Sequence, residues 1–159
     1  MGKIALVQNA QDTSGVLPLG PRQQLAAFTI GGFSVDSVTL TVENLAFQVS
    51  KSVQVEVTNW QLGVPDTNDR IGCSFNSGDS VVSCLSISDQ FGTLSGGMRT
   101  FRLFGDVTLV SGATNKNMQI SLNLAGDTET NGAVQWTDGS GHFNWVELEQ
   151  PLARSTLWK

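Results

Sequence analysis

The sequence has no tyrosine, a single histidine and few charged side chains for its 159 residues. Charged residues make up 14% of the chain, the net charge is −5, and the nine Lys and Arg residues are scattered singly. Because nucleic acids are bound by clustered Lys and Arg, this distribution argues against a nucleic-acid partner. A zinc site is also disfavoured, since it takes four ligands and the chain has one His and two Cys.

Long apolar runs are absent as well. No segment approaches the roughly 20 apolar residues of a membrane helix, so we expect no membrane insertion. Apolar residues nowhere recur at helical spacing over two turns, which argues against long helices. The first residues lead into a polar segment rather than the core of a signal peptide, although a mature form could have lost its export segment.

What the sequence does have is apolar residues alternating with polar ones, which predicts strands with one buried face. The clearest example runs from Thr100 to Leu124, where two alternating runs flank the polar stretch 111–117. We predict that these two runs fold back on each other as an antiparallel hairpin. The same alternation predicts strands at Val38–Val42 and Val53–Val57, and a second hairpin between Ile71 and Ser88.

Turn-forming clusters separate these strands, and the chain contains 17 Gly. About eight to ten short strands at intervals of roughly ten residues, with no helices between them, are typical of a sandwich or barrel. The loop lengths vary more than those of an up-and-down barrel. We therefore predict an all-β fold in which residues 1–159 form a single two-sheet antiparallel sandwich of the immunoglobulin-like kind.

Both ends of the chain carry apolar segments that are candidates for pairing with another molecule. Ile4 and Leu6 lie within residues 1–13, which we interpret as an edge strand that could extend or exchange. Leu157 and Trp158 lie in a final short strand, where Trp158 could also fasten the strand to its own core. A terminal strand that completes a neighbour's sheet would link copies into a filament or layer.

The two cysteines fall on opposite arms of the hairpin predicted between Ile71 and Ser88. A turn at 77–79 would place Cys73 opposite Cys84, so that a disulfide could form. Such a bond contributes on the order of 3 kcal/mol in the chain-entropy model and implies an oxidising compartment, hence an extracellular or cell-surface location. The alternative is two buried thiols that pack as small hydrophobes.

An acidic stretch after the central strands approximates a calcium-binding loop. Asp127, Glu129 and Asn131 alternate before Gly132, and Asp138 follows at the far end. Alternating oxygen ligands with a Gly at the sharp turn are what such a loop requires. The pattern also fits an Asn-Gly hairpin turn with exposed acids, which we favour because the customary final Glu is missing.

Trp60, Trp136 and Trp145 are the candidates for a binding surface, since exposed flat rings can stack on sugars. One core-facing Trp per strand is equally ordinary, and we favour burial. His142 follows a Gly-rich turn, where a solvated imidazole is the simpler interpretation than a catalytic base. No residue pattern selects a nucleophile or a pair of acids, so we predict a protein that is not an enzyme, with glycan binding as the alternative to a structural role.

Several stretches resemble a known group of domains. The segments in question are Ser14–Val16, Leu25–Ile30, Val38–Leu40, Arg102–Val107, Ala133–Asp138, Asn144–Trp145, Pro151–Leu152 and Thr156–Leu157. They resemble poorly characterised immunoglobulin-like modules in surface proteins of uncultured, small-genome bacteria. The resemblance implies an exported β-sandwich without catalytic residues. From the apolar chain ends we expect its partner to be a protein, by self-association.

Overall fold

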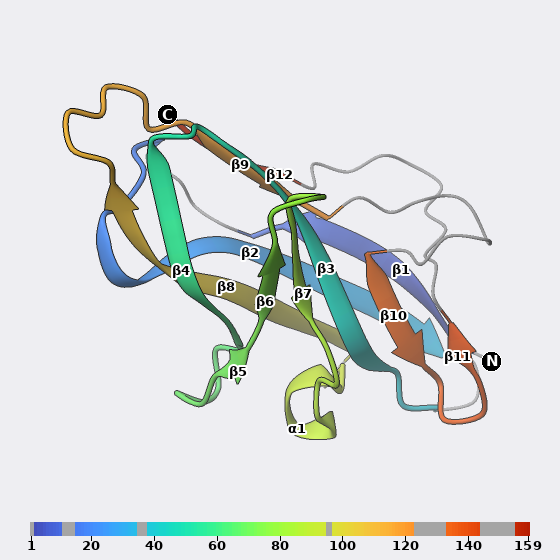
Figure 1. The fold of residues 1–159 in the computed structure, drawn as a ribbon. Coiled ribbons are helices and arrows are strands. Elements are labelled where there is room, and N and C mark those ends of the chain that lie inside the picture. Colours follow the sequence, from blue (N-terminus) through green and yellow to red (C-terminus); the bar gives the residue numbers. More distant parts are fainter. Residues whose placement is uncertain (1, 11–14, 35–37, 95–96, 123–132, 144–154) are drawn as a thin grey trace.

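A computed structural model of the chain describes residues 2–10, 15–34, 38–94, 97–122, 133–143 and 155–159. These residues form two antiparallel sheets (Figure 1). The first sheet has five strands in the order β1 (Gly2–Asn9), β2 (Gly20–Ser34), β8 (Met98–Leu109), β4 (Val55–Gly63) and β5 (Ile71–Gly72). The predicted two-sheet sandwich is confirmed.

The second sheet has seven strands and is built around β3 (Thr41–Lys51). Its main path runs β11 (His142–Phe143), β10 (Val134–Thr137), β3, β7 (Val81–Cys84) and β6 (Ser74–Asn76). β9 (Met118–Ser121) lies beside the C-terminal half of β3, and β12 (Ser155–Trp158) lies beside β9. One short helix, α1 (Asp89–Gly92), follows β7. The strands outnumber the eight to ten expected because several are only two to four residues long, too short for an alternating pattern to register.

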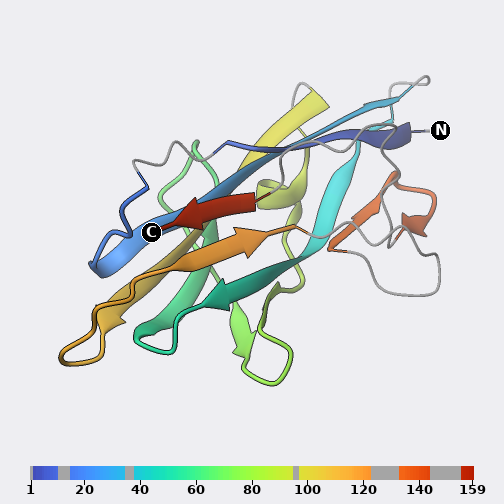
Figure 2. The ribbon, with the colours of Figure 1, turned by 90° about the horizontal axis from the view of Figure 1, so that it is seen from above.

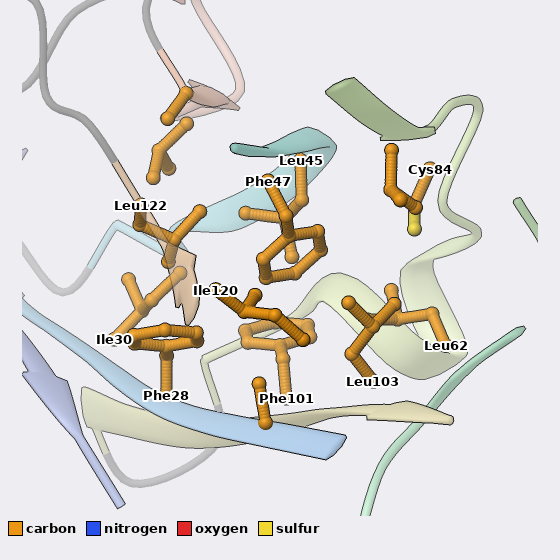
Figure 3. Close-up of a cluster of buried hydrophobic side chains, with 14 of the residues drawn as sticks. Phe28, Ile30, Leu45, Phe47, Leu62, Cys84, Phe101, Leu103, Ile120 and Leu122 are labelled. Carbon is orange, nitrogen blue, oxygen red and sulfur yellow. The ribbon is translucent and has the colours of Figure 1, made fainter. Parts of the chain in front are cut away.

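The core lies between the two sheets, where large side chains of both point at one another (Figure 3). Phe28 of β2 and Phe101 of β8 come from the first sheet, and Phe47 of β3 comes from the second; all three are fully buried. The rings of Phe28 and Phe47 lie 5.9 Å apart between centroids, a normal separation for packed aromatics. Burial of these alternating residues is what holds the two layers together.

The central hairpin predicted from Thr100 to Leu124 is wrong. Both strands exist, but β8 pairs with β2 and β4, while β9 pairs with β3 and β12 in the opposite sheet. The connecting residues cross between the layers, and the Gln54 side chain accepts hydrogen bonds from the backbone N–H groups of Thr114 and Asn115. Alternation identifies a buried face correctly but does not say which strand lies alongside.

One long side of the sandwich is closed by a strand that changes sheets. Gly72 is the last residue paired with β4, and the backbone N–H of Cys73 still donates to Trp60 O. From Ser74 onward the chain pairs with β7 in the other sheet. The first and second sheets are therefore continuous through Cys73 at this side.

The first and last strands close the opposite side (Figure 2). β1 is the outermost strand of the first sheet and β12 lies outside β9 in the second. A backbone hydrogen bond from Lys159 N to Gly15 O joins the segment after β1 to the end of β12. The two chain ends thus lie along one side of the molecule.

Two smaller expectations also need correction. Val53 was expected in an inward strand face but lies in the turn between β3 and β4, where it is 90% exposed. Two consecutive glycines, Gly31 and Gly32, would ordinarily be expected to interrupt a strand, yet β2 continues through them to Ser34. Gly32 lies so close to the Lys3 carbonyl and the Leu40 side chain that a Cβ would collide there, so the glycine allows close packing rather than ending the strand.

Candidate functional site

The two cysteines meet where the chain changes sheets. Cys73 and Cys84 are joined by a disulfide, with 4.5 Å between their Cα atoms. Ser74 pairs with Ser83, which places the cysteines opposite each other one step further along the same register. The sequence-based disulfide is therefore correct, and it fastens the sheet-changing strand to β7.

Trp60 and Trp136 do not form a ligand-binding surface. They are 4% and 5% exposed. Trp60 packs against Phe75 of β6, and Trp136 stacks on Phe143 of β11 with 4.4 Å between ring centroids. Both rings fill space within the sandwich because they lie on the buried faces of β4 and β10, so sugar stacking on either is ruled out in this structure. Trp145, the third candidate, lies outside the described residues.

Trp158 is also buried, and its partner explains why. Its indole N–H donates to the Leu25 carbonyl at 2.9 Å. Leu25 lies in a β-bulge of β2, between the paired positions Gln24 and Ala26, and β1 ends short of it. The bulge interrupts the ladder at Leu25, and Trp158 supplies a donor to its carbonyl. Trp158 therefore fastens the last strand to its own core and does not reach a neighbour.

Most of the predicted calcium loop falls outside the described residues, namely Asp127, Glu129 and Asn131. Asp138 is described, and its carboxylate organises a turn of its own. The backbone N–H groups of Ser140 and Gly141 and the Ser140 hydroxyl all donate to Asp138 Oδ1. The backbone hydrogen bond from Ser140, followed by that of its hydroxyl, lowers the pKa of Asp138. Within the ranges that the structure describes, no three His, Cys, Asp or Glu side chains are grouped as metal ligands would be.

His142 lies on β11 and its imidazole Nδ1 is 2.8 Å from Glu43 Oε2 of β3. The imidazole is largely exposed, at 79% of its side-chain area. An exposed pair of this kind is a weak surface contact and carries no nucleophile with it. This agrees with the interpretation of His142 as a solvated side chain, although the contact with Glu43 was not foreseen.

The four residues proposed for assembly differ in what they expose. Ile4 is buried on the core face of β1, Leu6 is partly buried, and β1 pairs along its whole length with β2. Leu157 is 50% exposed, whereas the adjacent Trp158 points into the core. Of the four, Leu157 is the one that presents an apolar side chain to the outside.

A hollow that the sequence did not foresee opens at one end of the sandwich. It has a volume of about 330 Å³ and lies between the β3–β4 turn and the β6–β7 turn. Its lining includes Val49 and Lys51 of β3, Val53, Phe75 and Ser80. These residues come from two stretches of the chain, 48–53 and 75–80, which the fold brings together.

A comparison of the chain with models of known protein families finds no match. The parts of the chain that the structure covers contain no helix long and apolar enough to cross a membrane.

Proposed function

We propose that this protein is an extracellular structural module that associates with further copies of itself along the side where its first and last strands lie. Such a module acts by mechanical contact with other molecules rather than by catalysis. The disulfide supports an oxidising, exported setting, since such bonds persist outside the cytosol. The observation that carries the proposal is the outer edge of β12 at Leu157.

The direction of the Leu157 backbone follows from its neighbours. In an antiparallel pair, successive residues turn their N–H and C=O groups alternately toward and away from the partner strand. Lys159 N donates to Gly15 O on the side away from β9, so Leu157, two residues earlier, also faces away from β9. Leu157 thus combines outward backbone groups with a half-exposed apolar side chain. An exposed apolar strand edge is a template for adding another strand.

The edge of β1 is a poorer candidate for the contact. Ile4 and Val7 are almost completely buried, main chain included, at 2% and 0% exposure. Removing residues 1–10 would strip both from the core, so a deletion would test folding as much as assembly. Point variants on β12 avoid that ambiguity.

The test is the oligomer distribution of a Leu157→Lys variant measured by sedimentation velocity over a range of protein concentrations. Lysine at an exposed edge position opposes strand addition, so we expect wild-type protein to form larger species and the variant to remain monomeric. Leu85→Lys is the matched control because Leu85 is a similarly exposed leucine, at 60%, on a segment remote in sequence from β12. A monomeric wild type, or a Leu157→Lys variant that assembles as well as wild type, would contradict the proposal.

A further inference from the structure

The outer face of the first sheet carries two arginines that lie far apart in the sequence and that the fold brings together. Arg102 of β8 is paired with Gly63 of β4. Its side chain points away from the core, since its neighbours Phe101 and Leu103 are the fully buried ones. Arg70, which directly precedes β5, lies over Gly63, where a Cβ would be 2.9 Å from Arg70 Nη1. Because Cβ atoms of paired residues are about 5 Å apart, Arg70 Nη1 is no more than about 8 Å from the Cβ of Arg102.

Arg70 is held against the sheet by the residues beneath it. Its guanidinium carbon lies 4.0 Å from the centre of the Phe104 ring, in a cation–π contact. Phe104 lies on the same outer face of β8 as Arg102 and is 8% exposed. Gly63 leaves room for this arrangement, because a Cβ would also come within 3.1 Å of Phe104 Cε2. The φ angle of Gly63 is not positive, so space for Arg70, rather than backbone conformation, favours glycine here.

Neither guanidinium has a carboxylate partner among the described residues. Arg70 Nη1 donates to the backbone carbonyl of Asp69, and the Arg102 side chain makes no hydrogen bond or ion pair with them. Asp106, on the same face of β8, accepts a hydrogen bond from Arg22 N instead. Acids outnumber Lys and Arg by 14 to 9 in this chain, so the two arginines are not unpaired for want of acids. Two like charges held close together attract an anion to the space between them.

We propose that this part of the outer face binds a carboxylate of an acidic polysaccharide, to which Arg70 and Arg102 donate from two sides. Guanidinium groups bind carboxylates through paired N–H donors. The hydroxyl oxygens of Thr29 and Thr100, 2.8 Å apart, share one hydrogen bond and keep one hydroxyl proton for a sugar. Gln61 of β4 adds an amide on the same face. The proposal is independent of self-association through Leu157, which belongs to the second sheet.

Other partners fit this surface less well. A protein interface has an apolar centre, but the apolar side chains beside the arginines, Ala27 and Phe104, are already covered at 2% and 8% exposure. Met98, which is exposed, lies at the start of β8. A nucleic acid calls for a run of cations that two arginines do not make. The face offers two charges among hydroxyl and amide groups, which suits a chain of sugar acids.

The experiment follows ¹⁵N-labelled, oxidised full-length protein by NMR while tetragalacturonic acid is added. The control ligand is the methyl ester of this tetramer, which keeps the sugars but lacks the charges. We expect the Nε–H signals of Arg70 and Arg102 and the backbone amide of Gly63 to shift with the acid until saturation, and not to shift with the ester. Binding should weaken as NaCl is added, because salt screens exposed charges.

A variant at Arg102 tests the contribution of the second charge. Arg102→Gln should weaken binding of the acid about fivefold, which corresponds to an exposed ion pair worth about 1 kcal/mol. The fold should be retained, since this side chain makes no hydrogen bond with the described residues. Lys116→Gln is the matched control, because it removes the same charge from the stretch between β8 and β9 and should leave the affinity unchanged.

A variant at Gly63 tests how Arg70 is positioned. The methyl group of Gly63→Ala would collide with the end of the Arg70 side chain, which can swing aside without loss of the fold. We expect binding of the acid to weaken about fivefold, as for Arg102→Gln, because one of the two ion pairs is lost. The alanine itself would touch no ligand, so this result would show that the position of Arg70 matters.

Four results would overturn the proposal. The first is the absence of saturable shifts with the acid, and the second is equal binding of the methyl ester. The third is an Arg102→Gln variant that binds as well as wild type, or no better than Lys116→Gln, which would leave only a general effect of charge. The fourth is tighter binding of acetyl-Asp-Asp-Asp-Asp-amide than of the acid, which would make the partner an acidic peptide. Sedimentation of the Leu157→Lys variant decides self-association separately.

Discussion

Replacing both cysteines by alanine should lower the stability of the fold by about 3 kcal/mol. The bond joins residues separated by 11 positions. In the chain-entropy model, closing a loop of this size removes unfolded-state freedom worth about 3 kcal/mol. For a domain of this length, each kcal/mol shifts the melting temperature by roughly 2–4 °C, so we expect a drop of roughly 6–12 °C.

The folded hairpin should survive without the bond. The pairing of β6 with β7 and the hydrogen bond from Cys73 N to Trp60 O use backbone groups that alanine retains. Cys84 is fully buried, and alanine avoids placing a serine hydroxyl there. The loss should therefore come mainly from a freer unfolded chain, with the native contacts nearly unchanged.

The assay is urea unfolding followed by tryptophan fluorescence, with oxidised wild type, reduced wild type and the Cys73→Ala/Cys84→Ala variant in parallel. The variant should match reduced wild type and should not respond to reductant. Oxidised wild type and variant unfolding at the same urea concentration would refute the reasoning, because the bond would then contribute nothing. A variant without cooperative unfolding would refute it differently, since the bond would then be required for the native sandwich itself.

Two further predictions concern buried polar groups. Trp158→Phe should lower the free energy of unfolding by about 1–3 kcal/mol more than Trp60→Phe does. The reason is that Trp158 Nε1 donates a hydrogen bond to the buried Leu25 carbonyl, whereas Trp60 Nε1 has no partner in the described residues. Equal losses of stability in urea unfolding would contradict this. Asp138 has a lowered pKa in the folded state because Ser140 donates to its carboxylate. Because the folded state holds the pKa of this carboxyl below its unfolded value, near 4, the ionised group stabilises the fold at pH values above about 4. This stabilisation is lost as the pH falls through the folded-state pKa. Asp138→Asn should therefore flatten the pH dependence of stability below about pH 4, measured by urea unfolding at each pH.

The sequence predicted which face of each strand is buried better than it predicted which strands pair with each other. Alternation in β8 and β9 identified two strands with a buried face each, and both lie in the core as expected. It could not reveal that the two lie in opposite sheets, because a hairpin and a crossover place the same side chains inward. The cysteines were predicted correctly because their partner lies in the same hairpin, so local register sufficed.

Long-range pairing also explains why the site was not foreseen. The hollow exists because β7 covers only four residues of the longer β3, Leu45 to Gln48. The turn at Gly78 and Asp79 marks where β7 begins, but no residue of β3 marks where its partner strand stops. Trp158 was ambiguous for the same reason, since its acceptor is the Leu25 carbonyl 133 residues away in a bulge. Such features depend on where two distant strands stop, which periodicity within one strand does not encode.

The two sheets are held together differently at the two long sides of the sandwich. At Cys73 the sheets are continuous through the main chain and are reinforced by a covalent bond, so this side resists opening. At the opposite side, two hydrogen bonds of the described residues connect β12 and the residue after it to the first half of the chain, from Lys159 N to Gly15 O and from Trp158 Nε1 to Leu25 O. Few and local contacts make a region open more readily than the global fold. Load applied along the chain ends would therefore act first on the β12 side, and the disulfide would keep the β6–β7 hairpin, and with it the hollow, intact while that side opens.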